Sequence, residues 1–456
     1  MKKIIIAGAG LSGLTLAYTL LNKNREYDIT VLEPEKRTGG KVWTDRTEGY
    51  LCEKGPNGFL DNKPKTLELC ASLGIDPVRS NENAKKRFIF MRNRLNPLPE
   101  SPPAFLKSDI ISWPGKLRML YEIIASKGPA DETVADFIIR RLGKEALETL
   151  IDPMASGIYA GNPYTMSITS CFPRIKELEQ EYGSLIRAMI KIQKQKKLQN
   201  KGKGDSEVSV APGGRLTSFF NGAQTLTDTL TEKIGDRLRL GVSVQGMSRN
   251  GNDYRLHTSA GDMDADIVVL ASPAYASSTI VKDLDGELSK LLGRIPYPHL
   301  SVVCFGYKRE KVNRSLEGFG FLVPHKEGRK ILGTLWDSSV FPNRAADGHV
   351  LLRTMIGGAK HPDIAGLEDK NIIDIVYDEL KSVMGLTTEP DMVRVYRWDK
   401  AIPQYLLGHN KLLAQIDDRL TASPGLYLTG NSYRGIGMND CVANSYALAD
   451  QIAEGL

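Results

Sequence analysis

The sequence lacks the residue patterns that build metal centres, disulfide frameworks and membrane spans. Its 456 residues contain five cysteines, and no two of them form a C-x-x-C pair. This scatter argues against a zinc site or a redox pair and predicts buried thiols in a reducing, cytoplasmic compartment. The six histidines show no H-x-x-x-H or H-E-x-x-H spacing, so we expect no metal. No run of about 18 apolar residues occurs, and we expect no transmembrane helix.

Composition and charge restrict the class of protein further. Hydrophobic residues make up 41% and charged residues 25% of the chain, as in ordinary soluble proteins. The length predicts two or three lobes, each with its own core. The net charge of +6 suits anionic partners such as acidic lipids or a carboxylate-bearing substrate. Because the chain carries no nucleic-acid recognition module, we expect no nucleic-acid partner.

A glycine motif at the start of the chain predicts a dinucleotide site. The apolar residues 4–7 are followed by Gly8, Gly10 and Gly13, and the next apolar strand ends at Glu33. These glycines permit a tight turn, the approach of a pyrophosphate and close packing of a helix, while the carboxylate accepts the ribose hydroxyls. The alternative is a glycine-rich turn without a ligand. Because the motif also occupies the place where a signal peptide would be cleaved, we expect the mature chain to begin near Met1. The cofactor residues predicted from this motif are Gly8, Ala9, Gly10, Leu11, Ser12, Gly13 and Glu33.

The organisation of the chain predicts an α/β fold with α+β inserts. Strand-like segments at 239–244, 267–271 and 425–430 suggest that the chain returns to one Rossmann-like sheet, which makes the cofactor domain discontinuous. The first insert is helical by pattern, at 116–127, 134–150 and 184–198, and the second alternates strands with a helix at 370–384. The predicted domains are a cofactor-binding domain (1–84, 218–294 and 398–456), a mixed-sheet substrate domain (85–103, 188–217 and 295–397) and a helical membrane-binding lobe (104–187).

One segment of the helical insert is typical of a membrane interface. Phe105, Leu106, Ile110, Ile111 and Trp113 lie close to lysines, as apolar residues of interfacial segments do. The alternative is that these side chains pack against neighbouring helices. The first reading predicts a peripheral protein on the cytoplasmic face of a membrane.

Further motifs carry a resemblance to known families. The run Arg37-Thr38-Gly39-Gly40-Lys41 resembles the second fingerprint of the flavin amine oxidase superfamily, which implies FAD as the cofactor. Residues 53–58 (EKGPNG), 152–161 (DPMASGIYAG) and 430–441 (GNSYRGIGMNDC) resemble three segments of the oxygen-dependent, FAD-containing protoporphyrinogen oxidases, most closely the plant and myxobacterial branch. The likeness runs essentially from end to end.

This resemblance implies both a reaction and its site residues. Protoporphyrinogen IX would lose six electrons and become protoporphyrin IX in heme biosynthesis, with O2 as acceptor and H2O2 as product. Noncovalent FAD would carry the chemistry, so no catalytic side chain is assigned, and a homodimer is allowed. The resemblance adds the cofactor residues Pro34, Lys41, Gly55, Pro56, Asn57, Gly58, Val244, Trp398, Gly430, Asn431, Ile436, Gly437 and Met438.

The same resemblance assigns five residues to the substrate. Arg87 would pair with a propionate, Leu322 and Leu335 would sandwich a pyrrole ring, Gly157 would bring the backbone close to the macrocycle, and Met355 stands where plant members carry an aromatic residue. A surface basic patch is the alternative for Arg87, and ordinary core packing for the apolar residues. The chain departs from related sequences at Asn162 and Asn431, and neither change removes a glycine.

Other functions remain open at this point. A coproporphyrinogen III oxidase would share the fold, but its substrate has four propionates and needs more basic residues. Amine oxidation or carotenoid desaturation would share only the two FAD fingerprints. A protein that binds FAD without catalysis is a third alternative.

Overall fold

The computed structural model describes residues 1–23, 26–199, 214–251 and 253–455. The chain forms two compact units, each assembled from segments distant in sequence. The first unit contains residues 1–80, 215–297 and 410–456, and the second contains residues 81–214 and 298–409. Residues 200–213, part of the predicted substrate-domain segment 188–217, lie outside the described residues. The predicted three-domain boundaries therefore stay a prediction, and each unit is described by itself.

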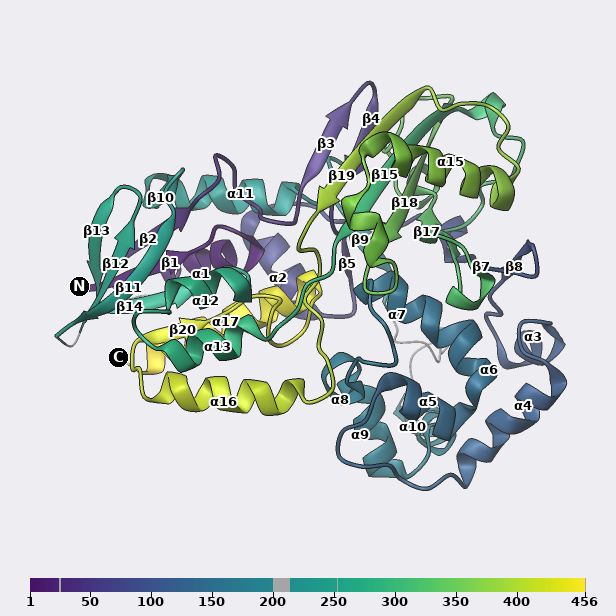
Figure 1. Cartoon of the computed structure of the whole chain (residues 1–456), viewed down its shortest axis with the longest axis horizontal. Coiled ribbons are helices and arrows are strands. Elements are labelled where there is room, and N and C mark those ends of the chain that lie inside the picture. Colours follow the sequence, from purple (N-terminus) through teal and green to yellow (C-terminus); the bar gives the residue numbers. More distant parts are fainter. Residues whose placement is uncertain (24–25, 200–213, 252, 456) are drawn as a thin grey trace. The chain divides into compact units, whose positions relative to one another are not determined.

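A parallel five-stranded sheet forms the centre of the first unit (Figure 1), in the order β10-β2-β1-β14-β20. Alternate residues of β1 enter two different cores. Ile4 and Ile6 pack on one face with residues of α1, α11 and α17, whereas Ile5 packs on the other with residues of β12, α12, α13 and α16. A sheet buried on both faces has apolar residues at successive positions, which explains its continuous apolar strands. The sheet consists of β1 (Lys2–Ala7), β2 (Tyr27–Glu33), β10 (Leu238–Leu240), β14 (Ile267–Leu270) and β20 (Leu426–Leu428).

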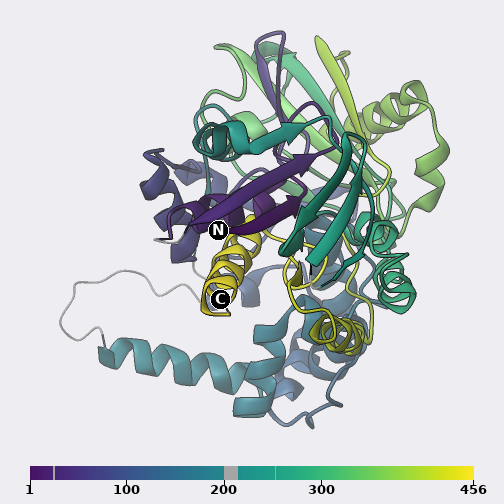
Figure 2. The same cartoon turned by 90° about the vertical axis from the view of Figure 1, so that its left-hand side faces the viewer.

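The remaining elements of this unit cover the sheet or form short hairpins beside it. Figures 1 and 2 both show the start of β1 and the end of α17 at the same end of the unit. The helices are α1 (Leu11–Leu21), α2 (Pro64–Leu73), α11 (Thr225–Ile234), α12 (Ala274–Ile280), α13 (Gly286–Gly293), α16 (His409–Thr421) and α17 (Met438–Glu454). The smaller sheets contain β3 (Thr44–Thr47), β4 (Tyr50–Glu53), β5 (Phe59–Leu60), β6 (Val78–Arg79), β9 (Leu216–Ser218), β11 (Val244–Asn250), β12 (Asp253–Thr258) and β13 (Gly261–Ala265).

The predicted strand at 239–244 was wrong in its extent. Strand β10 ends at Leu240, and Gly241 takes a left-handed conformation with φ of 74°. Because this turn redirects the chain, Val244 begins a different strand, β11, which pairs with β12 in an antiparallel sheet.

A mixed seven-stranded sheet forms the centre of the second unit, in the order β19-β15-β18-β17-β16-β7-β8. Only the β16–β7 pair is parallel. Helix α15 (Asp369–Met384) covers one face and shares an apolar core with it. The strands are β7 (Arg87–Met91), β8 (Arg94–Pro97), β15 (Leu300–Lys308), β16 (Gly320–Leu322), β17 (Ile331–Leu335), β18 (His349–Gly357) and β19 (Met392–Trp398).

The helices of this unit are shorter and more often interrupted than the sequence pattern predicts. The predicted helix 134–150 breaks at Gly143, whose φ is 93°, and continues through a π-helical turn at Leu147–Ile151. The predicted helix 116–127 ends at Leu120 and gives way to the 3₁₀ turn η2 (Tyr121–Ile123). The helices are α3 (Pro102–Lys107), α4 (Trp113–Leu120), α5 (Val134–Leu142), α6 (Lys144–Ala146), α7 (Asp152–Tyr159), α8 (Ile168–Cys171), α9 (Pro173–Tyr182) and α10 (Leu185–Gln199).

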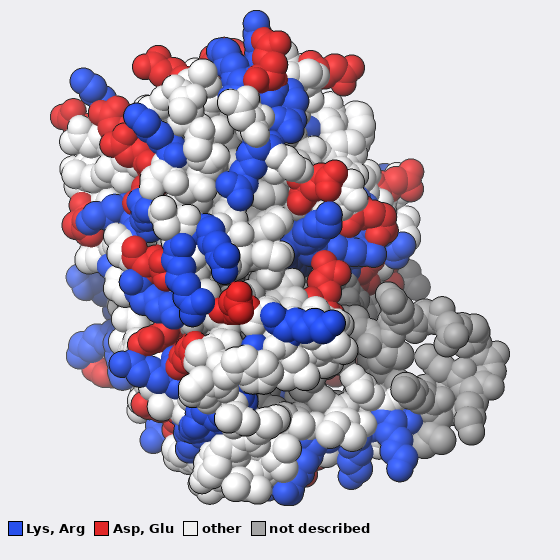
Figure 3. Space-filling view, turned by 90° about the vertical axis from the view of Figure 1, so that its right-hand side faces the viewer, with Lys and Arg blue, Asp and Glu red and all other residues white. Residues whose placement is uncertain are grey.

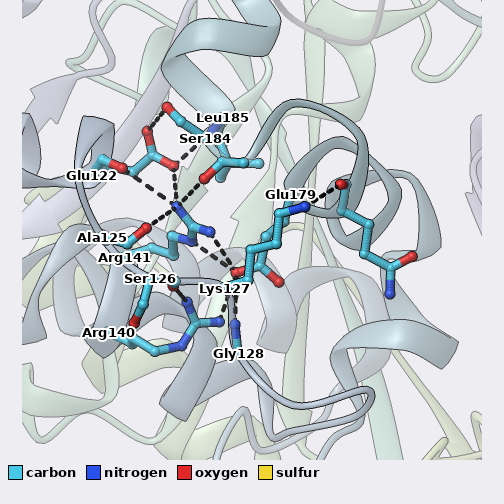
Figure 4. Close-up of polar contacts among 12 residues, drawn as sticks. Glu122, Ala125, Ser126, Lys127, Gly128, Arg140, Arg141, Glu179, Ser184 and Leu185 are labelled. Carbon is cyan, nitrogen blue, oxygen red and sulfur yellow. Dashed lines mark hydrogen bonds and ion pairs between the residues drawn. The ribbon is translucent and has the colours of Figure 1, made fainter.

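A buried ionic network joins these helices (Figure 4). Arg141 has no exposed side-chain surface, and its guanidinium nitrogens lie 3.1 Å from Glu122 Oε1 and 2.7 Å from Glu179 Oε1. Burial alone would raise the pKa of Glu179, but hydrogen bonds from Lys176, Arg141 and Arg140 lower it to about 2. Buried charges of this kind are tolerated only when they are well paired. The network therefore fixes η2, α5 and α9 against one another.

Candidate functional site

The glycine turn after β1 shows why each glycine is present. Gly8 has a φ of 113°, which residues other than glycine rarely adopt. A Cβ on Gly13 would lie 2.0 Å from the carbonyl oxygen of Gly8, whereas a Cβ on Gly10 would meet no atom within 4 Å. The fold therefore requires glycine at 13, and the space in front of Gly10 is open to a ligand. Helix α1 starts at Leu11 with no side-chain cap, so its N-terminal N–H groups and dipole favour an anionic group there.

Glu33 is held beside this turn. Its side chain is 8% exposed, and its carboxylate accepts hydrogen bonds from the backbone N–H of Ala9 at 2.8 Å and of Glu35 at 3.1 Å. Burial raises the pKa of Glu33, and these two hydrogen bonds oppose the rise. A carboxylate at the end of β2, next to the helix N-terminus, can accept ribose hydroxyls. The open space at Gly10 and this carboxylate fit a bound dinucleotide.

The glycine-pair motif, residues 37–41, lies directly against the glycine turn of residues 8–13. The N–H of Gly39 donates to the carbonyl of Ala9 at 2.8 Å. Arg37 donates to the carbonyls of Thr38 at 3.0 Å and Gly40 at 2.8 Å. The arginine therefore holds the glycine pair in its turn.

The segment of residues 55–58 packs against Lys41, the last residue of the glycine-pair motif. A Cβ on Gly55 would lie 2.0 Å from the carbonyl oxygen of Lys41, so the predicted segment 55–58 passes close behind the glycine-pair motif. Burial lowers the pKa of Lys41 to about 8. An anionic ligand nearby would favour its charged form.

The C-terminal motif, residues 430–441, contacts the glycine turn of residues 8–13 through α17. Gly437 precedes the first residue of α17, Met438, and its N–H donates to Asp440 at 3.1 Å. The hydroxyl of Ser445 donates to the carbonyl of Ser12 at 2.9 Å, which ties α17 to α1. The structure thus brings the three motifs together in the first unit. The other residues predicted in this unit are Pro34, Pro56, Asn57, Val244, Gly430, Asn431 and Ile436, whereas Trp398 belongs to the second unit, and all remain predictions.

The predicted substrate residues share one face of the seven-stranded sheet. Arg87 is opposite Gly320, which is opposite Leu335, while Leu322 aligns with Gly333 and then with Met355. Cross-strand neighbours point to the same side of a sheet, and residues two apart on one strand do as well. This face is opposite the one that packs on α15.

Gly157 lies over the same face. A Cβ on Gly157, in α7, would lie 2.8 Å from a methyl carbon of Leu322. The structure therefore places the five predicted substrate residues on or against one surface of the second unit.

The sequence reasoning missed two glycines of this face, which let neighbouring strands and side chains pack closely. A Cβ on Gly320 would lie 2.1 Å from the carbonyl oxygen of Thr334, and a Cβ on Gly333 would lie 2.5 Å from that of Phe321. Both glycines are buried. Gly320 lies between Arg87 and Leu335 in the sheet, and a Cβ on Gly333 would also lie 2.9 Å from a methyl carbon of Leu322. Glycine inside a strand often marks such a close approach, and this was the available signal.

Arg87 carries the charge at one end of this face. Its side chain is exposed and lies over the ring of Phe319, with 5.2 Å between the guanidinium carbon and the ring centroid. Among the described residues, no carboxylate lies within ion-pair distance of Arg87. Its pKa is nevertheless lowered by desolvation, because protein atoms surround part of the side chain. In contrast, Arg353 on the same face is 3% exposed and donates to Asp337 at 2.7 Å.

An apolar surface on the helical segment differs from the predicted one. Ile110 and Ile111 are only 2% and 1% exposed, so including them was wrong, and they pack inside the unit. Phe105 is half-buried. The exposed apolar side chains of α3, α4 and η2, with the residue that follows, are Leu106, Trp113, Leu117, Leu120, Tyr121 and Ile124, at 51 to 71% exposure.

Figure 3 shows uncharged atoms gathered at the lower end of one face, with lysines and arginines along their border.

In the described part of the chain, no helix combines the length and hydropathy of a membrane span. No group of three or more potential metal ligands occurs in that part either.

Comparisons with known proteins point to one family. The profile of flavin containing amine oxidoreductases matches residues 11–453. Coproporphyrinogen III oxidase of Bacillus subtilis is 31% identical, over 97% of this chain and 96% of that protein. The chloroplastic protoporphyrinogen oxidase of rice is 32% identical, over 99% of this chain and 88% of that protein. A solved structure of a candidate protoporphyrinogen oxidase from Exiguobacterium sp. 255-15 superposes with a TM-score of 0.85 at 26% identity, over 100% of this chain and 99% of that one.

Gly10 provides a test of the cofactor site. A Cβ at this position meets no protein atom within 4 Å, so Gly10→Val should fold normally but lose most of its flavin, because the side chain fills the space needed by the pyrophosphate. Flavin absorbance per mole of protein and the unfolding midpoint measure the two effects. In the matched control, Gly13→Val, the clash with Gly8 should instead impair folding. Full flavin occupancy in Gly10→Val would contradict the assignment.

Proposed function

The chain belongs to the family of flavin-containing amine oxidoreductases, and we propose that it uses FAD to oxidise a porphyrinogen, with protoporphyrinogen IX as the substrate. The family makes the protein a flavin-dependent oxidoreductase. The substrate, O2 as electron acceptor and a role in heme biosynthesis belong to the proposal. Relatives that carry the names protoporphyrinogen oxidase and coproporphyrinogen III oxidase align over nearly their whole length, which supports this class of substrate.

The observation that carries the proposal is the composition of the substrate face. It offers one exposed cation, Arg87, beside a strip of half-buried aliphatic side chains, Leu322, Leu335 and Met355. From β7 to β18 the strip crosses four strands, about 14 Å at the usual strand spacing. Such a surface suits a wide, largely apolar ring system with a carboxylate at one edge. A small amine would leave most of it uncovered.

The charge on this face favours the substrate with fewer carboxylates. Arg353 is neutralised by Asp337, with 2.7 Å between Nε and Oδ2. Among the described residues that β7, β16, β17 and β18 contribute to this face, Arg87 is therefore the charged side chain without a carboxylate partner. Protoporphyrinogen IX has two propionates and coproporphyrinogen III has four. Because a Bacillus subtilis relative bears the name coproporphyrinogen III oxidase, oxidation of that substrate is the second candidate function.

The protein's part in the reaction is to bind and orient. FAD, when bound, accepts hydride from the substrate and passes the electrons to O2, and three such rounds remove six electrons and six protons and form three H2O2. Arg87 would hold a propionate in a bidentate fork. Leu322, Leu335 and Met355 would pack on the macrocycle, and Gly157 would let it approach α7. These contacts would fix which ring carbon faces the flavin.

The mode of flavin attachment is also part of the proposal. We expect FAD to be bound noncovalently, because Cys441 on α17, the last residue of the 430–441 segment, is 8% exposed and burial raises the pKa of its thiol to about 11. The thiolate, not the thiol, is the nucleophile. Acid precipitation should therefore release all of the flavin into the supernatant.

The two candidate functions are separated by direct comparison of substrates. Oxygen consumption by the purified, FAD-loaded protein should be faster with protoporphyrinogen IX than with coproporphyrinogen III at equal low concentrations, where the rate reports kcat/KM. The reverse order would establish the second candidate. A protein that holds FAD but oxidises neither compound would contradict porphyrinogen oxidation altogether.

Replacing Arg87 separates substrate binding from flavin binding. A lost charge-assisted hydrogen bond is typically worth about 1.5–3 kcal/mol, so Arg87→Ala should lower kcat/KM by roughly ten- to a hundredfold. The effect should appear mainly in KM for protoporphyrinogen, with normal flavin content. Lysine should rescue only partly because it lacks the fork.

Arg94→Ala is the matched control for Arg87→Ala, since Arg94 is an exposed arginine of the neighbouring strand β8. Its KM should equal that of the unmodified protein. An unchanged KM in Arg87→Ala would show that the propionates are held elsewhere.

We extend the proposal to peripheral attachment to the cytoplasmic face of a membrane. The exposed series Trp113, Leu117, Leu120, Tyr121 and Ile124 follows helical spacing, and such a face suits burial at a lipid interface. The adjoining Glu122 has no exposed surface and accepts hydrogen bonds from Ser184 at 2.6 Å and from Leu185 N at 2.7 Å. The ionic network of Figure 4 thus holds this apolar surface in place.

Sedimentation with vesicles tests the membrane proposal. The intact protein should sediment with vesicles rich in phosphatidylglycerol at low salt, and less with neutral vesicles. A Trp113→Asp/Leu117→Asp variant should partition at least roughly tenfold less, because two apolar side chains no longer insert. Phe220→Asp, a change at a 54% exposed aromatic of the first unit, is the control and should behave like the original. Failure of the intact protein to sediment would remove the proposal.

A further inference from the structure

A single indole ring contacts two cations of the flavin motifs. The guanidinium carbon of Arg37 lies 3.6 Å from the ring centroid of Trp43, and the ammonium nitrogen of Lys54 lies 3.3 Å from it. Neither the sequence motifs nor the resemblance assigns a role to Trp43. We call these three residues the Trp43 cluster.

The Trp43 cluster joins two segments of the predicted cofactor site. Arg37 belongs to the glycine-pair motif and donates to the carbonyls of Thr38 and Gly40 at 3.0 and 2.8 Å. Lys54 precedes Gly55, and its backbone N–H donates to the carbonyl of Trp43 at 2.9 Å. The indole therefore sits where residues 37–41 and 53–58 meet.

The Trp43 cluster also preserves positive charge. The carboxylate nearest to Arg37 is that of Glu35, 3.3 Å away on a side chain that is 61% exposed, and exposed pairs of this kind are weak. Burial lowers the pKa values of Arg37 and Lys54, and the negative charges of Glu35 and Asp45 respectively oppose this shift. The negative face of an aromatic ring attracts a cation but carries no net charge that would cancel it. The ring thus offsets part of the desolvation cost and leaves the positive potential for a ligand.

We propose that Trp43 is a positioning residue for FAD: its π face holds Arg37 and Lys54 together and still charged, beside the backbone turn that receives the dinucleotide's pyrophosphate. This inference rests on the flavin site of the proposed function. The alternative is that Trp43 only fills space at the base of the β3–β4 hairpin, in which case any side chain of adequate bulk would serve.

The test uses FAD affinity and its salt dependence, not turnover. Apoprotein variants are titrated with FAD at low and high ionic strength. Trp43→Leu should raise the Kd for FAD about five- to fiftyfold at low salt, given the usual strength of cation–π contacts, and should make Kd less sensitive to salt because fewer cations are held near the pyrophosphate. Trp43→Phe retains a π face and should restore both quantities most of the way. The control Tyr164→Leu changes a 51% exposed aromatic of the second unit and should match the original protein.

Lys54→Gln keeps the indole and tests the charge even if Trp43→Leu misfolds. It should also weaken FAD binding and flatten its salt dependence. The proposal is overturned if Trp43→Leu binds FAD normally, if Trp43→Phe is as impaired as Trp43→Leu, or if affinity falls with unchanged salt dependence. Normal FAD binding without porphyrinogen oxidation in the unmodified protein would instead contradict the proposed function and leave the role of Trp43 intact.

Discussion

The close contact between Gly13 and the carbonyl oxygen of Gly8 is the constraint on which the cofactor site depends. A single Cβ at position 13 would lie 2.0 Å from that oxygen, so only glycine lets α1 pack so near the end of β1. This packing points the N-terminus of α1 at the space in front of Gly10, and it puts Ala9 within reach of both Glu33 and Gly39. Two motifs separated in sequence are thereby fixed as one surface.

The remainder of the first unit supports that surface by burying the sheet on both sides. Alternate residues of β1 serve two separate cores, and the strand ends therefore meet at one edge, where open α/β sheets bind their ligands. In the second unit the sheet is mixed and one face packs on α15. Its other face is free to carry Arg87, Leu322 and Met355, so the two sheets contribute different chemistry: one suits an anionic dinucleotide, and the other an apolar ring with a carboxylate.

The sequence alone predicted the features that depend on local spacing. The glycines, Glu33 and the buried strands follow from short patterns, and the structure confirms the α/β class. The sequence could not predict where Gly241 would turn the chain, nor that Ile110 and Ile111 face inward, because both depend on neighbours distant in sequence. The positions of Gly320 and Gly333 beside the predicted substrate residues depend on cross-strand register, which no local pattern encodes. The roles of Val244 and Trp398 in cofactor binding follow from the resemblance alone.

The arginines of the two units differ in how strongly carboxylates neutralise them. Arg141 and Arg353 are buried and paired with carboxylates, and such pairs leave little potential for another anion. Arg87 and Arg37 lie over the rings of Phe319 and Trp43, and Arg37 also lies 3.3 Å from the carboxylate of the exposed Glu35. A ring holds a cation in a defined place without cancelling its charge, so each of these arginines is both ordered and able to attract an anion. Arg140 and Lys176 of the ionic network also lie over a ring, that of Phe137, so what distinguishes Arg87 is that no carboxylate of the described residues pairs with it.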